Sequence, residues 1–379
     1  MSKKTEQNIE TIAIHSGMEH NSGSRSISPP LEVSTNFEHD ERGFQEGDYI
    51  YTRDSNPNRD QLENVLTKLE KGEACAAFSS GIAAMNAVFM NVEKGAHILI
   101  PEDLYHGSRA LLENYSDRRN IDYSSVDTTN LEKFEAAFQS NTKLVVLETP
   151  SNPLLLITDL RKAIQIAHSK GAIVCVDNTF ATPFNTNPVE FGADLVMHST
   201  SKYLGGHSDI LGGAIISAKD DPFFQKIQTI QKSQGAVPSP RDCWLLTRSI
   251  RSFPYRMRGH NENAQKVAEY LENHPRILKV NYPGLKNHQG HEIAASQMKG
   301  FGGMISFLVD GDYAETLRIV ARSKIIRRAT SLGGIESLWE HRRSTEGEPS
   351  PTPENLVRFS VGLEHIDDLI EDLKSSLGE

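Results

Sequence analysis

Short apolar runs alternate with segments of helical periodicity between residues 97 and 217. Buried strands are predicted over residues 97–100, 121–126, 143–147, 172–176, 195–198 and 214–217. Helices are predicted between the earlier strands, over residues 107–115, 131–138 and 159–168. This β–α alternation predicts an α/β fold, in which helices cover a mostly parallel sheet.

The chain of 379 residues is long enough for more than one domain. Residues 1–58 show no helical periodicity and are predicted to form an irregular arm, either disordered or ordered by packing on another subunit. Residues 59–250 are predicted to form a large domain around the parallel sheet. Residues 251–379 are predicted to form a smaller C-terminal α/β domain, with strands over 278–281 and 303–309 and helices over 256–271, 313–321 and 366–377.

The overall charge argues against a nucleic-acid partner. The formal net charge is −10, whereas proteins that bind nucleic acids normally present a basic patch. The arginines between Arg241 and Arg258 are a local exception. Because they alternate with apolar residues in a predicted helix, we expect them on a solvated or interface face.

The cysteines and the apolar runs indicate a cytoplasmic protein. Cys75, Cys175 and Cys243 form no C-x-x-C pair, a pattern typical of a reducing compartment. The N-terminus lacks the apolar segment of a signal peptide. No run approaches 18 apolar residues, so no membrane partner is expected.

Several common site motifs are missing from the chain. His288 and His291 lie three residues apart without a further His/Cys cluster, so no metal site is predicted. There is no G-x-G-x-x-G after a first strand, no Walker motif and no G-x-S-x-G. These absences count against nicotinamide enzymes, P-loop NTPases and α/β-hydrolases.

Polar and reactive side chains follow the ends of the predicted strands. They are Tyr105, Glu148, Asn152, Asp177 and the run from Ser199 to Lys202. Open parallel sheets bind ligands beyond the carboxyl ends of their strands, so we expect these side chains to converge. A lysine beside hydroxyl groups suits a phosphate-bearing carbonyl cofactor held as a Schiff base. Taken alone, Lys202 is more simply a surface lysine, and Asp177 is equally well a turn or N-cap residue.

A second candidate for phosphate binding precedes a predicted helix. The segment from Ser79 to Ile82 follows the predicted helix over residues 59–70 and opens a further helix. The free N–H groups of a helix N-terminus attract phosphate. The same Ser-Gly pattern also serves as an ordinary helix cap.

Nine motifs occur in one order along the chain: YTRDSNPNRDQLENVLTKLEKGE, SSGIAA, DLYHG, ETPSNP, VDNTF, HSTSKYLGGHSDILGG, YPGL, SLGG followed by IESL, and RFSVGLE. Together they resemble the pyridoxal-phosphate (PLP) enzymes of Cys/Met metabolism, which include cystathionine γ-synthase, cystathionine γ-lyase, cystathionine β-lyase and methionine γ-lyase. The resemblance extends from about residue 30 to the C-terminus. It implies pyridoxal 5'-phosphate as cofactor and the aspartate-aminotransferase fold (fold type I). It also implies a homo-oligomer, commonly a homotetramer built of dimers whose active sites use both subunits.

The resemblance assigns catalytic roles to three residues. Lys202 would form the Schiff base and later act as the base at the substrate Cα. Asp177 would keep the pyridine nitrogen protonated, so that the ring remains an electron sink. Tyr105 would stack on the ring and serve as acid or base towards the leaving group.

The resemblance also implies binding residues. Phosphate contacts are expected from Ser80, Gly81, Ile82, Ser199 and Ser201, and from Tyr51 and Arg53 towards the phosphate of a neighbouring subunit. The family usually has threonine in the place of Ser201, but the hydroxyl remains. Arg358 would bind the substrate α-carboxylate as a bidentate pair, assisted by Ser331, and Asn152 would contact the ring hydroxyl and the substrate.

The reaction depends on contacts with the substrate side chain, a small-molecule amino acid. Cystathionine-handling members often carry carboxylates where this chain has Ile50 and Thr330. This departure weakens the case for cystathionine and favours methionine γ-lyase, unless replacement contacts come from the unusual segment HRRSTEGE and its surroundings, namely Glu336, Arg342, Arg343 and Glu346. We expect γ-replacement or γ-elimination, of the cystathionine γ-synthase or γ-lyase type. Methionine γ-lyase, cystathionine β-lyase, an aminotransferase of the same fold and a non-catalytic relative are the alternatives.

Overall fold

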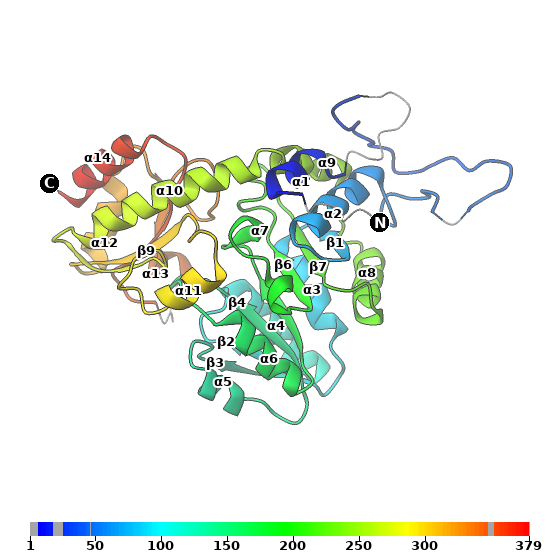
Figure 1. Cartoon of the computed structure of the whole chain (residues 1–379), viewed down its shortest axis with the longest axis horizontal. Helices are drawn as coiled ribbons and strands as arrows, with labels where there is room; N and C mark the ends of the chain where they lie inside the picture. The colour runs from blue at the N-terminus through cyan, green and yellow to red at the C-terminus, as the bar shows by residue number, and fades with distance from the viewer. Residues whose placement is uncertain (1–6, 18–25, 46, 348–351, 379) are drawn as a thin grey trace.

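The computed structural model describes residues 7–17, 26–45, 47–347 and 352–378. Parts of the predicted N-terminal arm and Glu348, the last residue of HRRSTEGE, lie outside the described residues. Figure 1 shows a body built on two sheets, with the long helix α10 (Phe253–Glu272) running from the region of α1 and α9 to the C-terminal part.

A seven-stranded sheet forms the first body, in the order β1-β7-β6-β5-β4-β2-β3. Its strands are β1 (Ala74–Phe78), β2 (His97–Pro101), β3 (Asp122–Val126), β4 (Thr142–Glu148), β5 (Ile173–Asp177), β6 (Leu195–His198) and β7 (Gly213–Ser217). The pairs from β3 to β6 are parallel, and β7 is antiparallel to both of its neighbours. The predicted mostly parallel α/β sheet is therefore confirmed. The edge strand β1 was not predicted, because its small residues give no clear strand signal.

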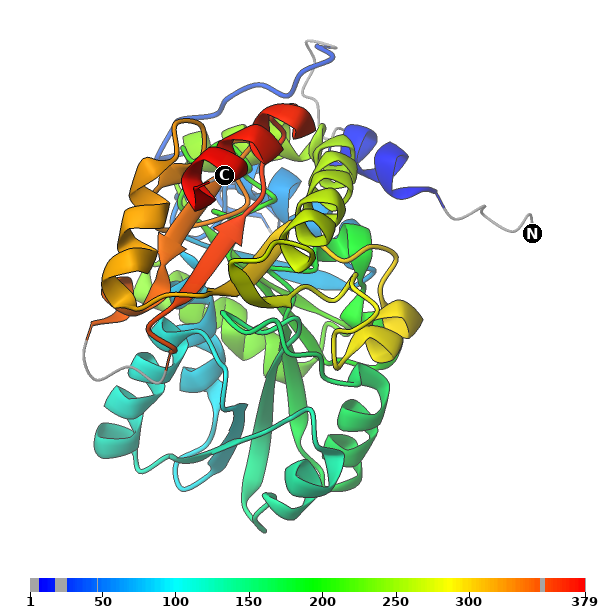
Figure 2. The same cartoon turned by 90° about the vertical axis from the view of Figure 1, so that its left-hand side faces the viewer.

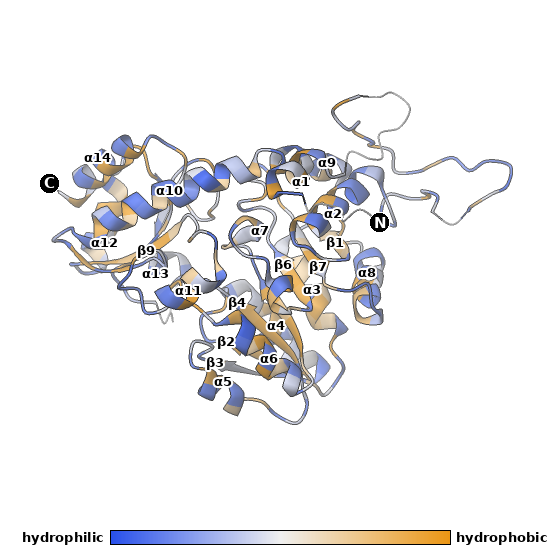
Figure 3. Cartoon of the chain, viewed as in Figure 1, coloured by the Kyte–Doolittle hydropathy of each residue, from blue (hydrophilic) through white to orange (hydrophobic). Residues whose placement is uncertain are grey.

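Helices cover both faces of this sheet. They are α3 (Gly81–Asn91), α4 (His106–Arg119), α5 (Leu131–Ala136), α6 (Leu160–Ser169) and α8 (Pro222–Gln234), with the short elements α7 (Thr182–Asn185) and η1 (Pro188–Phe191) before β6. Val146 packs with α3 on one face, and its neighbours Val145 and Leu147 pack with α6 on the other. Hydrophobic colour accordingly gathers in the central strands and α3, while α10 and α14 at the periphery show hydrophilic faces (Figure 3).

A five-stranded sheet forms the C-terminal body, in the order β10-β11-β12-β9-β8. Its elements are β8 (Ile277–Asn281), α11 (His291–Gln297), β9 (Met304–Val309), α12 (Tyr313–Arg322), β10 (Arg327–Arg328), β11 (Leu338–His341), α13 (Arg342–Glu346), β12 (Leu356–Ser360) and α14 (Ile366–Leu377). Helices α10, α12 and α14 pack on one core with this sheet (Figure 2). The smaller α/β body was predicted, but β11 and β12, which carry key polar residues, were not. The exact domain limits at residues 58 and 250 remain predictions.

The N-terminal arm is more ordered than predicted. Ile9–His15 forms the helix α1, and Ile9, Ile12 and Ala13 pack on the core beside α2 (Pro57–Leu69) and α10. The prediction of a wholly irregular arm is wrong for this helix of about two turns, because seven residues are too few to show a periodicity. From residue 26 to the start of α2 the described chain holds a single bridge, Asn36 to Tyr51, and extends away from the body (Figure 1).

One arginine was placed wrongly by the sequence pattern. Arg256 is buried, and it donates hydrogen bonds to the carbonyl oxygens of Tyr203 at 2.6 Å and Leu204 at 3.2 Å. Its guanidinium leaves no room for a Cβ at Gly206, whose φ is +70°. The expectation of a solvated face therefore fails for Arg256, whereas Arg258 is exposed and pairs with Glu10 of α1. Helix α9 (Pro240–Ile250) precedes them.

No helix in the described part of the chain is long and apolar enough to cross a membrane. Across the same residues, no group of three or more His, Cys, Asp or Glu side chains is arranged to hold a metal ion.

Candidate active site

The carboxyl ends of β4, β5 and β6 lie next to one another. Glu148 is in register with Asp177, and Asp177 with Met197. Because the three strands are parallel, the segments that follow them leave the sheet at one edge. The turn after β6 carries Lys202 to this edge, as the sequence pattern predicted.

Lys202 lies in a polar setting that favours its neutral form. Its Nζ donates a hydrogen bond to Ser331 Oγ at 2.8 Å. The pKa of Lys202 is lowered to about 8, mainly by burial and also by the charge of Arg358, whereas the charge of Glu340 acts to raise it. A lysine with a pKa near 8 has a substantial fraction of free amine near neutral pH, as a nucleophile or base requires.

Asp177 and Glu148 form a buried carboxyl pair at the sheet edge. Burial raises the pKa of both side chains. The charge of Asp177 raises the pKa of Glu148 further, whereas hydrogen bonds from Thr179 and the nearby His198 act to lower that of Asp177. We therefore assign the proton to Glu148 and the negative charge to Asp177. Glu148 Oε2 also accepts a hydrogen bond from the backbone N–H of Tyr105 at 2.9 Å, which ties Tyr105 to this pair.

Glu70 joins the ends of the two strands that lead into the site. Its Oε1 lies 2.5 Å from His198 Nε2 and accepts a hydrogen bond from Asn178 Nδ2 at 2.7 Å. Asn178 and His198 directly follow Asp177 and Met197, the residues paired across β5 and β6. Sequence reasoning identified Glu70 only as a helix end, because a carboxylate there is usually solvated.

The start of α3 closely approaches the turn after β6. Ser80 Oγ accepts a hydrogen bond from the Ala83 N–H at 3.1 Å, which leaves Gly81 and Ile82 N–H without carbonyl partners inside the helix. A Cβ on Gly81 would lie 3.0 Å from Ser199 Cβ and 3.1 Å from its Oγ, so glycine permits this approach. Ser201 is engaged elsewhere, since its Oγ accepts from Gly212 N–H at 2.9 Å. The arrangement offers an anion two helix N–H groups and a hydroxyl.

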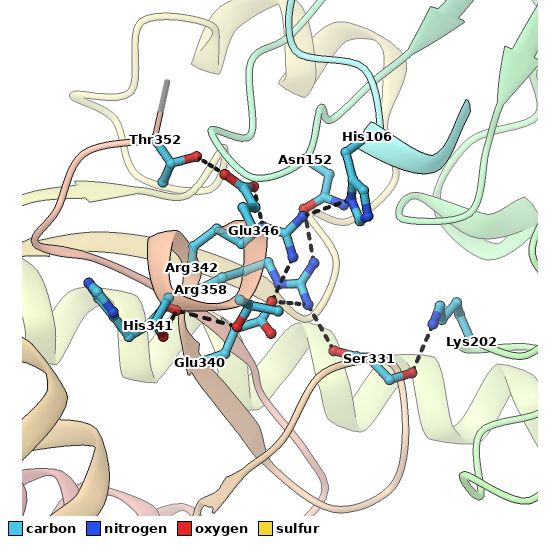
Figure 4. Close-up of polar contacts among 12 residues, drawn as sticks. His106, Asn152, Lys202, Ser331, Glu340, His341, Arg342, Glu346, Thr352 and Arg358 are labelled. Atoms are coloured by element: carbon cyan, nitrogen blue, oxygen red, sulfur yellow. Dashed lines mark hydrogen bonds and ion pairs between the residues drawn. The ribbon is translucent and has the colours of Figure 1, made fainter. Parts of the chain in front are cut away.

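Arg358 projects from β12 towards the same region (Figure 4). Its Nη1 donates to Asn152 Oδ1 at 3.0 Å, and its Nη2 donates to the Ser331 carbonyl oxygen at 3.1 Å. Nη2 also lies 2.5 Å from Glu340 Oε1. Burial lowers the pKa of Arg358 to about 10, which still leaves it charged at neutral pH. Through Ser331, one network links Arg358 with Lys202.

Residues of HRRSTEGE extend this network. Arg342 donates to Glu340 at 2.9 Å and to Glu346 at 2.7 Å, and its Nη2 lies 3.4 Å from His106 Nδ1. Glu340 and His106 were missed by the sequence reasoning. The available signal was that Glu340 and Arg342 alternate around His341, as side chains on one face of a strand do.

Residues 10–378 match the family model described as Cys/Met metabolism PLP-dependent enzyme. The chain belongs to this family. The resemblance seen in the motifs is thereby confirmed, and with it pyridoxal phosphate as the cofactor of an enzyme.

Relatives in the family span the whole length of the chain. Cystathionine gamma-synthase of Mycobacterium leprae is 41% identical over 97% of this chain and 96% of its own. Cystathionine gamma-lyase of Bacillus subtilis is 39% identical over 97% of this chain and 98% of its own. A crystal structure of cystathionine gamma synthase from Xanthomonas oryzae pv. oryzae, in complex with cystathionine, superposes with a TM-score of 0.94 at 38% identity, covering 98% of both chains. These matches support fold type I.

The side chains at the sheet edge fit the family's cofactor. An amine of lowered pKa, a buried carboxyl pair to which we assign one charge, on Asp177, and an anion cradle whose close approach requires a glycine lie around one edge. Lys202 would hold the cofactor aldehyde, Asp177 the ring nitrogen, and Gly81, Ile82 and Ser199 the phosphate. In this conformation the hydroxyls of Ser80 and Ser201 serve the backbone instead.

Two predicted phosphate contacts lie away from this edge in the single chain. Tyr51 is 42% exposed, and Cζ of the Arg53 guanidinium lies 5.7 Å from the centroid of the Tyr51 ring. Arg53 Nη1 donates to the Lys232 carbonyl oxygen at 2.9 Å. Their predicted role towards a neighbouring subunit therefore stays a prediction.

A separate cavity of about 300 Å³ lies between the two bodies. It is lined from one side by Leu154 and Ile157 and from the other by Lys279 and His288. No predicted site residue lines this cavity, so it is distinct from the candidate active site.

Proposed function

We propose that this enzyme acts on sulfur amino acids by γ-replacement or γ-elimination, as cystathionine γ-synthases and γ-lyases do. The network from Lys202 through Ser331 to Arg358 is the observation that carries the proposal. It places an amine that is partly neutral beside a guanidinium suited to an α-carboxylate. An α-amino acid presents the two groups that such a site would recognise.

Residues around this sheet edge have separate tasks in the chemistry. The bound cofactor supplies an electron sink for the charge that develops at Cα. Arg358 and Asn152 orient the substrate carboxylate, and Lys202 removes the Cα proton in its neutral form. The charge on Asp177 keeps the ring nitrogen protonated. Tyr105, anchored by Glu148, delivers a proton to the leaving group.

The choice among reactions rests on two exposed positions, because the relatives do not separate the reactions. Relatives named cystathionine gamma-synthase, gamma-lyase and beta-lyase match about equally well, at 41%, 39% and 40% identity. Ile50 and Thr330 are both exposed in the single chain and provide no carboxylate for a distal ammonium. That observation makes methionine γ-lyase the second candidate, ahead of cystathionine β-lyase.

We also propose a homotetramer built of dimers with shared active sites, located in the cytoplasm. The extended arm exposes large apolar side chains, among them Ile27 at 84%, Val33 at 67% and Phe44 at 52%. Several large apolar side chains exposed along one extended segment are typical of a segment that another chain covers. Tyr51 and Arg53 lie at the end of this arm, where a neighbouring subunit would receive them. The three cysteines are free and buried, which supports a reducing compartment.

A parallel product assay tests the proposal. The purified holoenzyme is assayed in three separate reactions. The first contains O-acyl-homoserine together with cysteine, the second contains cystathionine, and the third contains methionine. We expect cystathionine from the first, or 2-oxobutyrate and ammonia from one of the other two. Transamination of a keto acid without either outcome would indicate an aminotransferase and would refute the proposal, as would inactivity on all three substrates.

A further inference from the structure

One oxygen of Glu340 serves two arginines (Figure 4). The antiparallel pairing of β11 with β12 sets Glu340 directly opposite Arg358. Glu340 Oε1 lies 2.5 Å from Arg358 Nη2 and 2.9 Å from Arg342 Nη1. We call Glu340 with its two arginines the shared-carboxylate cluster.

Glu340 is incompletely satisfied. Its side chain is 4% exposed, and its Oε2 has no hydrogen-bond partner among the described residues. A buried carboxylate oxygen without a donor is energetically unfavourable. The position of Glu340 therefore depends on the two guanidiniums, and either one still pairs with the carboxylate when the other is taken by another anion.

Arg358 must change partners in order to bind a carboxylate as a bidentate pair. Its Nη2 carries two protons, and these already face the Ser331 carbonyl oxygen and Glu340 Oε1. A substrate carboxylate that uses both Nη groups needs the place that Glu340 occupies. Glu340 is thus a resident competitor of the substrate.

Arg342 is held independently of Arg358. Its Nε donates to Glu346 at 2.7 Å within α13, and Glu346 accepts a hydrogen bond from Thr352 at 2.7 Å. Arg342 Nη2 also lies 3.4 Å from His106 Nδ1, at the start of α4. These contacts fix the guanidinium, so it stays in place when Glu340 moves.

We propose that Arg342 is a positioning residue for substrate binding, which retains Glu340 when the α-carboxylate of an amino acid replaces Glu340 at Arg358. The inference rests on the function proposed above and explains what the HRRSTEGE segment does there. Without Arg342, Arg358 is the only charged partner of Glu340 among the described residues, and the substrate has to displace a buried anion that has no second cation to pair with. Affinity for the α-carboxylate then falls, while the chemistry at Cα is unchanged.

The test titrates the holoenzyme with two probes and follows the visible absorbance of the bound cofactor. L-alanine carries the α-amine and α-carboxylate but no leaving group, and ethylamine lacks the carboxylate. For Arg342→Met we expect about tenfold weaker L-alanine binding, the scale of a charge-assisted contact, with ethylamine binding unchanged. Arg318→Met, on the exposed face of α12, is the matched control. It should change neither value.

The double variant Arg342→Met/Glu340→Gln gives the sharpest outcome. Because Glu340→Gln removes the competitor, L-alanine binding should return to within about threefold of the wild type. Glu340→Gln alone should bind L-alanine more tightly than the wild type, and Arg342→Lys should stay within about threefold of it. These two variants keep the test open if Arg342→Met does not fold.

Three results would overturn the proposal. They are unchanged L-alanine binding in Arg342→Met, equal weakening of both probes, and a double variant that binds no better than Arg342→Met. The failure of the proposed function looks different. In that case the wild type binds the cofactor and responds to L-alanine, but releases no product from sulfur amino acids.

Discussion

Glu148 and Asp177 lie in register on the parallel strands β4 and β5, and burial raises the pKa of both carboxyls, that of Glu148 well above its usual range. We assign the proton of this pair to Glu148 and the charge to Asp177. The protonated Glu148 orders Tyr105 through its backbone N–H, while the ionised Asp177 is available to the cofactor ring. Two carboxyl groups of one edge thus have separate tasks, because their surroundings push their pKa values apart.

Amide substitutions should separate these tasks. Asp177→Asn removes the charge that holds the ring nitrogen protonated, and we expect kcat to fall by about 100-fold or more. Glu148→Gln mimics the protonated acid and keeps an oxygen for the Tyr105 N–H, so kcat should stay within about threefold of the wild type. Steady-state kinetics of the two variants gives both kcat values. An equal loss of kcat in the two variants would show that the proton is assigned to the wrong carboxyl group.

The lowered pKa of Lys202 predicts how cofactor capture depends on pH. The neutral amine reacts with the aldehyde, so the rate at which the cofactor-free protein takes up cofactor should rise with pH to a half-point near 8. An ordinary lysine would place the half-point near 10.5. Arg358→Met should raise the half-point and Glu340→Gln should lower it, because Arg358 lowers this pKa and Glu340 raises it. Stopped-flow absorbance provides the measurement. A half-point that is the same in the wild type, Arg358→Met and Glu340→Gln would contradict this electrostatic account.

The same shift has a consequence for stability. The folded-state pKa of Lys202 lies below that of the unfolded chain, so the unfolded chain binds more protons between about pH 8 and 10.5. This group alone therefore makes the cofactor-free protein more stable as the pH rises through that window. Urea unfolding of the wild type and Lys202→Met should show a wild-type gain that the variant lacks.

Glu70 should be important for the stability of the fold around the site. The His198–Glu70 pair is 1% exposed on each side, and Asn178 adds a hydrogen bond to it. Glu70→Ala leaves these donors without an acceptor and should lower the free energy of unfolding by about 3 to 5 kcal/mol. Glu63→Ala on the same helix is a useful comparison for burial effects. Urea unfolding measures both, and a loss below about 1 kcal/mol for Glu70→Ala would argue against its joining role.

Gly213 is required by the approach of β7 to the start of α3. A Cβ at this position would lie 2.3 Å from the Ser80 carbonyl oxygen and 2.7 Å from Gly81 Cα. Since both are backbone atoms, Gly213→Ala should displace the helix start, lower stability by about 1 to 3 kcal/mol and weaken cofactor binding. Thermal unfolding measures the loss of stability, and titration with the cofactor measures the loss of affinity. Unaltered cofactor affinity would mean that the anion cradle does not depend on this approach.

The helices and strands that can be predicted from the sequence are those with a regular apolar periodicity. The predicted strand over residues 195–198 and the predicted helix over residues 366–377 match β6 and α14, because each buries a regular apolar pattern. Strand β1 and the helix α1 escaped notice, since short segments of small or mixed residues carry little periodic signal. Arg256 was misplaced because sequence alone cannot show that three carbonyl oxygens converge on it.

The residues of the candidate site also fall into those that the sequence predicts and those that it does not. The convergence of Lys202 and Asp177 at one sheet edge is predictable from their place after apolar strands, whereas their roles and that of Arg358 come from the family motifs. The Glu70–His198 and Glu340–Arg342 contacts join residues that only tertiary packing brings together, or whose charges look solvated in the sequence. Glu336 and Arg343 were weighed with Arg342 and Glu346. The structure joins Arg342 to Glu340 and Glu346, whereas Glu336 accepts a hydrogen bond from Ser208.

The central claim is that Lys202 holds the cofactor, and reductive trapping tests it most directly. The holoenzyme is treated with borohydride, digested, and analysed by mass spectrometry for a phosphopyridoxyl group. We predict that the group is found on the peptide containing Lys202 and that Lys202→Ala gives no labelled peptide at this position. Labelling on another lysine, with Lys202 unmodified, would contradict the account.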